Sequence, residues 1–126
     1  MPEAALLSKD VYSLSPGEVA DIPLDRLPLF IRLAEEARNK TDSEWFSALQ
    51  HYNQTRLQLT VDFHEELKLG IRAAEFKANT DPNVVEVGIN SRAVRDRLRT
   101  ITSVVVQLKR TFEVKVGSAS CRQAEP

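Results

Sequence analysis

Two histidines and three nearby carboxylates are the first residues in this chain that could support chemistry. His51 and His64 are 13 positions apart, and Asp62, Glu65 and Glu66 lie beside the second histidine. Imidazole and carboxylate groups can hold zinc together, but the usual site on one helix needs two histidines about four residues apart. That spacing is missing here. We therefore expect solvated helix residues and no metal site.

The sequence also lacks a set of acid–base or nucleophilic groups that would indicate catalysis. The adjacent pairs Glu35/Glu36 and Glu65/Glu66 would point about 100° apart on a helix, so neither pair converges on one substrate. Cys121 is the single cysteine and lies in a polar segment with nothing to activate its thiol. The sequence has no phosphate-binding glycine loop and no serine-nucleophile motif. We predict that the chain is not an enzyme and takes no cofactor or small-molecule substrate.

The last third of the chain is basic, which favours an anionic or acidic partner there. Residues 91–126 hold 8 Lys/Arg against 3 Asp/Glu, whereas residues 1–50 hold 5 against 9. An internal match between the basic and acidic segments would explain the same distribution. The arginines that would share one side of a helix beginning near Ser91 are Arg92, Arg95, Arg99 and Arg110.

The same region has the spacing of a helix-turn-helix. Gly88 would lie in the turn, and Val94 and Leu98 would pack the recognition helix onto the preceding helix. That preceding helix would be only residues 82–87, which are rich in β-branched valine. A small DNA-binding regulator is therefore the alternative function, with the arginines against base edges or phosphates. Our main expectation is a packed corner at residues 80–90, followed by a bundle helix whose arginines face solvent or an acidic neighbour.

Length and composition indicate one intracellular helical domain. The chain has 126 residues, with 28% charged and 42% hydrophobic residues, which is ordinary for a soluble globular protein. Its N-terminus lacks the basic and apolar regions of a signal peptide, and no apolar run approaches the roughly 20 residues of a membrane span. One cysteine suits a reducing compartment. We expect a cytoplasmic or nuclear protein that does not bind a membrane.

Apolar periodicity predicts the elements that would position these residues. Helices are expected at about 26–39, at about 43–77 and from residue 91 to about 112. A capping box at residues 41–44 would begin the second helix, and Gly70 would bend or break it. Residues 79–83 form a turn. Residues 84–89 fit either a short strand or a helical turn capped by Asp81 with Pro82 at its first position.

These elements predict an all-α fold, an elongated antiparallel helical bundle with one long central helix. Short β segments at residues 84–89 and 112–116 are an alternative that the sequence leaves undecided. We divide the chain into an N-terminal arm (1–24), a helical domain (25–116) and a disordered tail (117–126).

The apolar face of the long helix is wider than two other helices can cover, so we expect a protein partner in a homo- or hetero-oligomer. The residues expected in the core or at a partner interface are Trp45, Leu49, Tyr52, Leu59, Phe63, Leu67, Leu98, Ile101, Val105 and Leu108.

Three stretches between about 24 and 113 follow one another in a recognisable order: IPLDRLPLFIRLAEEA, DSEWFSALQHYNQTRLQL and VVEVGINSRAVRDRLRTITSVVVQLKRTF. This order of elements resembles the helical domain of GINS, the four-subunit complex of the replicative helicase. The likeness is to subunits whose helical domain is C-terminal, although their small β domain would be absent or reduced to VYSLSPGEVADIP. The resemblance implies a non-catalytic subunit that pairs through helices, bridges the helicase to another protein and contacts DNA weakly if at all. This agrees with the scaffold role expected from the residues.

Overall fold

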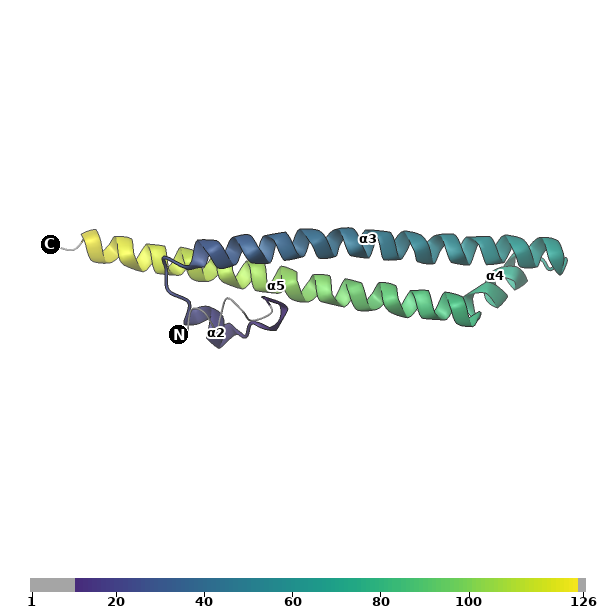
Figure 1. The fold of residues 1–126 in the computed structure, drawn as a ribbon, viewed down its shortest axis with the longest axis horizontal. Helices are drawn as coiled ribbons and strands as arrows, with labels where there is room; N and C mark the ends of the chain where they lie inside the picture. Colours follow the sequence, from purple (N-terminus) through teal and green to yellow (C-terminus); the bar gives the residue numbers. More distant parts are fainter. Residues whose placement is uncertain (1–10, 125–126) are drawn as a thin grey trace. The chain divides into compact units, whose positions relative to one another are not determined.

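The computed structural model describes residues 11–124, with side chains described as far as residue 119, and all regular structure in that part of the chain is helical (Figure 1). A 3-10 helix, η1 (Val11–Ser13), precedes four α-helices. These are α2 (Pro16–Ala20), α3 (Leu27–Glu66), α4 (Ile71–Asn79) and α5 (Pro82–Ala124). The all-helical fold and the long helix are confirmed. The short β segments at 84–89 and 112–116 are wrong, because both stretches lie inside α5.

Helix α3 is continuous over 40 residues, so the predicted break between residues 39 and 43 is wrong. Neither glycine nor proline occurs between Leu29 and Glu66, and extending a helix by one residue is easier than nucleating a second one. Thr41, expected to cap a new helix, is instead fully buried inside α3. A capping-box pattern therefore does not start a helix where the preceding turn is already helical.

The predicted break at Gly70 is confirmed, and it separates α3 from α4. Gly70 has an extended backbone at the N-cap of α4, with φ −60° and ψ 158°. Lys68 has a left-handed backbone with φ 57°, which turns the chain after the end of α3. His64 Nδ1 lies 2.6 Å from the carbonyl oxygen of Leu69 and ties this turn to the last turn of α3. The predicted helix over 43–77 is thus divided between two elements.

Helix α5 begins at Pro82, nine residues before the predicted start at Ser91. The carboxylate of Asp81 accepts a hydrogen bond from the backbone N–H of Asn83 at 2.9 Å, as expected for a helix with proline at its first position. Of the two structures left open for residues 84–89, the helical one is confirmed. The packed corner expected at residues 80–90 is wrong from residue 82 onward, and the corner is limited to Thr80 and Asp81.

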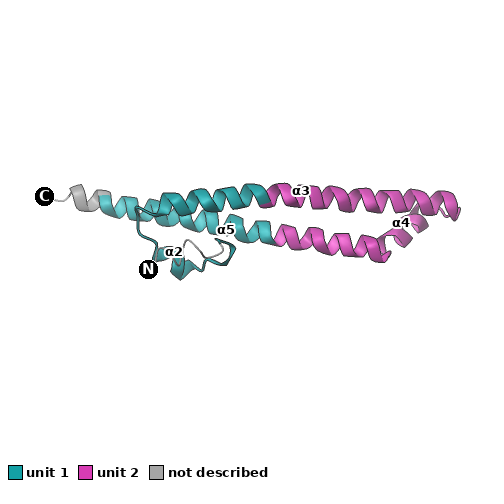
Figure 2. Ribbon diagram, viewed as in Figure 1, with its two compact units in different colours: residues 1–40, 97–126 teal, residues 41–96 magenta. Residues whose placement is uncertain are grey.

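The chain forms two compact units, residues 1–40 with 97–126 and residues 41–96 (Figure 2). We call them unit 1 and unit 2. This division differs from the predicted arm, helical domain and tail. Residues 11–13 and 16–20 are helical and belong to unit 1, and residues 117–124 continue α5. Residues 1–10 and 125–126 of the predicted arm and tail lie outside the described residues.

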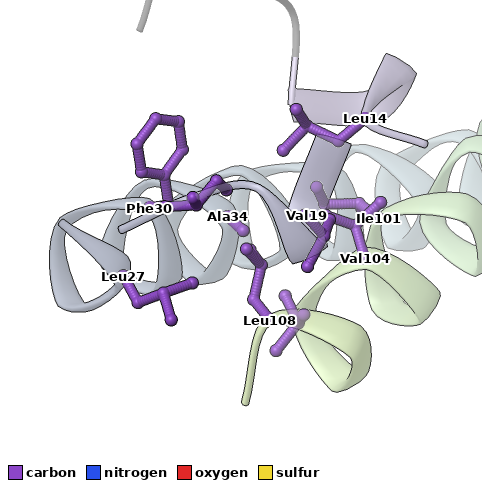
Figure 3. Packing of buried hydrophobic residues seen from close by; sticks show 10 residues of the cluster. Leu14, Val19, Leu27, Phe30, Ala34, Ile101, Val104 and Leu108 are labelled. Atoms are coloured by element: carbon purple, nitrogen blue, oxygen red, sulfur yellow. The ribbon is translucent and has the colours of Figure 1, made fainter. Parts of the chain in front are cut away.

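Unit 1 has a core of large apolar side chains (Figure 3). They come from the η1–α2 segment, the first turns of α3 and the second half of α5. The buried members are Leu14, Val19, Ile22, Leu27, Phe30, Ala34, Ile101, Val104, Val105 and Leu108. Leu98 and Phe112 pack against this core while remaining partly exposed. The apolar stripe predicted for the last helix is therefore the α5 side of a real core.

Polar contacts hold the N-terminal segment of unit 1 on the two long helices. Ser15 and Glu18 form a capping box that starts α2. Lys115 Nζ donates to the carbonyl oxygen of Ala20 at 2.8 Å and also to that of Ile22. Tyr12 donates from its hydroxyl to the carbonyl of Ala37 at 3.3 Å. The two Lys115 bonds satisfy carbonyl groups at and just after the end of α2, and the Tyr12 bond joins the segment to α3.

Candidate interaction surface

The interior of unit 2 consists mostly of small residues. The buried residues are Thr41 and Thr60 of α3, Ala74 and Ala78 of α4, and Val84, Gly88 and Ser91 of α5. Val84 is the largest apolar side chain buried among them, whereas unit 1 buries phenylalanine, leucine and isoleucine. Stabilisation by apolar burial scales with the area removed from water, at about 25 cal/mol per Å². Unit 2 therefore gains less from its fully buried side chains than unit 1 does.

Gly88 of α5 packs closely against the Tyr52 ring of α3 in unit 2. A Cβ atom at this position would lie 3.0 Å from Cε1 and 3.4 Å from Cδ1 of Tyr52. The Tyr52 ring is also covered by the guanidinium of Arg56, whose Cζ lies 5.5 Å from the ring centroid. A half-buried aromatic ring thus occupies the space that a larger residue at 88 would need, and this explains glycine in the middle of a helix.

About half of the large apolar side chains of unit 2 are exposed to solvent. Eleven large apolar side chains are exposed in the described part of the chain, and eight of them belong to unit 2. Isolated exposed apolar residues are normal on a protein surface, but a concentration of this kind marks an interaction site. The eight are Phe46, Leu57, Val61, Leu67, Ile71, Phe76, Val85 and Ile89.

A continuous part of this surface runs along α3. We call it the α3 outer face and define it as Phe46, Gln50, Asn53, Gln54, Leu57 and Val61, all of which are exposed. The steps from Phe46 through Gln50 and Asn53 to Leu57 are four, three and four residues, which places them on one side of a helix. At 100° per residue, this side is opposite the half-buried Tyr52 and Leu59.

The α3 outer face has no charged side chain. Between Trp45 and Val61 the only charged residue is Arg56, and it lies over the Tyr52 ring rather than on this face. A helix face that is simply solvated normally carries charged residues. An uncharged face with phenylalanine and leucine about two-thirds exposed, at 66% and 65%, is instead typical of a surface that another molecule covers.

The α3 outer face contains a groove, and a larger hollow adjoins it. The groove, of about 330 Å³, is lined by Phe46, Leu49, Gln50, Asn53, Gln54 and Leu57. The larger hollow, of about 690 Å³, reaches from Leu57 and Val61 past His51 to Leu59 on the inner side of α3 and to Asn83 at the start of α5. Leu57 borders both. The lining combines apolar walls with amide groups and contains neither a carboxylate nor an ammonium, which suits a protein surface better than a charged ligand.

Comparisons of the chain with protein-family models, with curated proteins and with solved structures found no match. The function has therefore to be inferred from the residues and the geometry of unit 2.

The residues predicted for the core or a partner interface fall into three groups. Ile101, Val105 and Leu108 are buried in the unit 1 core, and Leu98 packs against it. Leu67 is exposed at the end of α3. The α3 residues that are half-buried in unit 2 are Trp45, Leu49, Tyr52, Leu59 and Phe63. Of the ten, Leu49 is the one that also lines the groove on the α3 outer face.

The predicted arginines are divided between the two units. Arg92 is exposed in unit 2, and Arg99 and Arg110 are exposed in unit 1. Arg95 is half-buried, with Nε 3.9 Å from Asp96 Oδ1 and no hydrogen-bond partner for Nε. The turn that a helix-turn-helix needs at residues 88–91 is absent, because these residues lie within α5. The helix-turn-helix interpretation of Gly88, Val94 and Leu98 is therefore wrong.

The residues first considered for chemistry do not come together in space. Among residues 11–119, whose side chains the structure describes, no group of three or more His, Cys, Asp or Glu side chains is placed to hold a metal ion. His64 contacts the Leu69 carbonyl, and Asp62 accepts a hydrogen bond from Gln58 at 2.9 Å. No helix in this part of the chain combines the length and the apolar character needed to cross a membrane.

The sequence predicts one wide apolar face on the long helix, whereas α3 has apolar side chains on two opposite sides. Phe46, Leu57 and Val61 lie on the opposite side of the helix from Tyr52 and Leu59. The signal was present in the sequence. Residues 45–55 contain no charged residue, and the amides Gln50, Asn53 and Gln54 recur between the two apolar ends. Two apolar stripes on one helix indicate two contacts, one inside the chain and one outside it.

Proposed function

We propose that this chain is a non-catalytic helical subunit of a protein assembly and that it joins the assembly through unit 2. The observation behind this proposal is the distribution of side chains in unit 2, where the fully buried residues are alanine, threonine, serine, glycine and one valine, while phenylalanine and leucine side chains are exposed. Covering the outer side chains would supply the apolar burial that the interior of unit 2 lacks. A GINS-type subunit of the replication machinery is the specific form of this proposal, and it rests on the resemblance in element order.

A co-purification experiment with matched variants tests the proposal. The full chain, tagged and expressed in its native host, is compared with Leu57→Glu on the α3 outer face and with Val114→Glu in unit 1. Both side chains are about two-thirds exposed, at 65% and 67%, so neither change disturbs a core. A charge in a covered apolar contact is strongly unfavourable. Partners are expected to be lost with Leu57→Glu and retained with Val114→Glu.

Two results would overturn the proposal. One is an identical set of co-purifying proteins for the wild type and Leu57→Glu, together with a monomer for the wild type in solution. The other is an enzymatic activity of the purified chain. The GINS-type form is tested separately by identifying the captured proteins. Components of the replicative helicase among them would support it, and an assembly without them would remove it while leaving the general subunit role intact.

A further inference from the structure

We infer that a second copy of this chain covers the α3 outer face, with the two α3 helices antiparallel in a symmetric dimer. The inference rests on the proposed function, since it names the partner of the same surface. The two-fold axis passes between His51 and Tyr52. Phe46 of each copy then lies across from Leu57 of the other, and Gln50 lies across from Asn53.

The spacing of the face fits this arrangement. Steps of four, three and four residues are those of the contact positions in a pair of packed helices. Phe46 and Leu57 are five and a half residues from the axis on either side, and Gln50 and Asn53 are one and a half residues from it. A two-fold interface uses the same patch on both copies, so the patch must complement itself when reversed. For these four residues an apolar residue meets an apolar residue and an amide meets an amide, whereas Gln54 lies across from Leu49 and Val61 across from Asp42.

The two amides favour a protein helix of the same kind over a lipid or a uniformly apolar partner. The side-chain amides of Gln50 and Asn53 each carry hydrogen-bond donors and an acceptor, so Gln50 of one copy can form hydrogen bonds with Asn53 of the other across the axis. Against hydrocarbon, or against an apolar helix, these amides would be buried without partners, which is unfavourable. A polar residue at a contact position is also a known means of fixing the register of paired helices.

Charge selects the antiparallel orientation over the parallel one. Asp42 and Glu65 flank the two ends of the α3 outer face. In a parallel pair each carboxylate would lie beside the same carboxylate of the second copy, and like charges side by side are unfavourable. In the antiparallel pair Asp42 lies across from the uncharged Val61. Because the face itself is uncharged, a second copy adds no repulsion along the contact.

The dimer is expected to be weak and dependent on concentration. A contact from Phe46 to Val61 is about 24 Å long at 1.5 Å per residue, which is short for a permanent interface. A dissociation constant in the micromolar range fits a contact of this size. Sedimentation equilibrium of the full chain between about 1 and 100 μM should therefore show a monomer–dimer equilibrium.

Matched variants assign the equilibrium to this face. Leu57→Glu places a charge in the contact twice, once per copy, and should raise the dissociation constant by at least ~100-fold. Val114→Glu, at an equally exposed site in unit 1, should leave it unchanged. A wild type that stays monomeric over the whole range overturns the inference, as does equal dimerisation of the wild type and Leu57→Glu. Circular dichroism of both variants confirms that they keep their helices.

Cysteine cross-linking tests the orientation. Phe46→Cys and Leu57→Cys are made in chains with different tags, each with Cys121→Ser so that the native thiol does not interfere. In the antiparallel pair position 46 lies beside position 57, so oxidation of the mixture should give a cross-link between the two tags. Either variant alone should give none, because its two thiols are about 16 Å apart along the axis. Cross-linking of Phe46→Cys with itself would establish a parallel pair and overturn the inference.

The failure of this inference is distinguishable from the failure of the proposed function. A monomeric wild type whose captured partners are lost with Leu57→Glu would keep the α3 outer face as an interface and remove the second copy as its occupant. A monomeric wild type whose partners are unaffected by Leu57→Glu would remove both.

Discussion

Replacing Gly88 with alanine should change the stability of unit 2 in a direction that depends on Tyr52. Alanine in a helix interior is more favourable than glycine by about 0.8–1 kcal/mol. Against this, the new methyl would lie 3.0 Å from Cε1 of the Tyr52 ring, so the ring has to move by several tenths of an ångström. Overpacking of this kind costs about 1–3 kcal/mol. We expect a net loss of about 1 kcal/mol for Gly88→Ala.

The change in stability caused by Gly88→Ala should have the opposite sign when the Tyr52 ring is removed. In a Tyr52→Ala background nothing opposes the methyl, and Gly88→Ala should then stabilise the protein by about 1 kcal/mol from helix propensity alone. The coupling between the two positions is therefore about 2 kcal/mol, well above the error of a double-mutant cycle. A cycle of the wild type, both single variants and the double variant measures it directly.

Urea unfolding followed by tryptophan fluorescence is a suitable assay, because Trp45 is the only tryptophan and lies in unit 2. A change of 1 kcal/mol moves the urea midpoint by about 0.3–1 M for the usual slopes of small proteins. Equal slopes in all four proteins are required before the free energies of unfolding are compared. If Gly88→Ala stabilises the wild type as much as it stabilises Tyr52→Ala, then α3 and α5 do not approach closely at this point, and our account of the small interior of unit 2 is refuted.

Three further predictions concern the core, the N-terminal segment and the arginines. Leu108→Ala should lower the free energy of unfolding by about 2–5 kcal/mol in urea denaturation, because Leu108 is fully buried in the unit 1 core; a loss below 1 kcal/mol would contradict that packing. Lys115→Met should speed amide hydrogen exchange in residues 16–22 by removing two hydrogen bonds to that segment, and unchanged exchange there would show that the bonds hold nothing. If exposed Arg92, Arg99 and Arg110 bind DNA, affinity in a mobility-shift assay should fall steeply with salt, and an absent or salt-independent shift removes that role.

The core residues of the last helix can be predicted from the sequence, because the apolar side chains that recur with a helical period are the same ones that pack in the unit 1 core. Ile101, Val105 and Leu108 were assigned to a core from their spacing alone, and they are buried in unit 1. Gly70 was expected to interrupt the long helix, and the interruption does lie there, with α3 ending at Glu66 and Gly70 at the N-cap of α4. In both cases a local preference and the tertiary contacts favour the same structure.

The errors occurred where a local signal competed with the neighbouring helix. Thr41 fits a helix cap, but its place in the interior of unit 2 and the uninterrupted residues on both sides keep α3 continuous. Val84 and its neighbours favour a strand by β-branching. They are helical because Pro82 and Asp81 start a helix there, and because Gly88 on the same side lets α5 approach Tyr52. Such a contact joins residues 36 positions apart, and no local pattern reveals it.

Unit 2 contains two apolar stripes on one helix, and this bears directly on function. A single stripe would be satisfied by packing within the chain, as in unit 1. In unit 2 the inner side of α3 meets alanine, glycine and serine, while the outer side has phenylalanine, leucine and amides without charges. If the outer stripe served only solubility, charged residues would be expected between Phe46 and Val61, since they keep a helix face hydrated at no structural cost. The arrangement is instead what a subunit needs when the stability of its own interior is low and its partner supplies the remaining apolar contact. Hydrogen exchange in α3 residues 41–66 should therefore slow as protein concentration rises, while exchange in the unit 1 core stays constant.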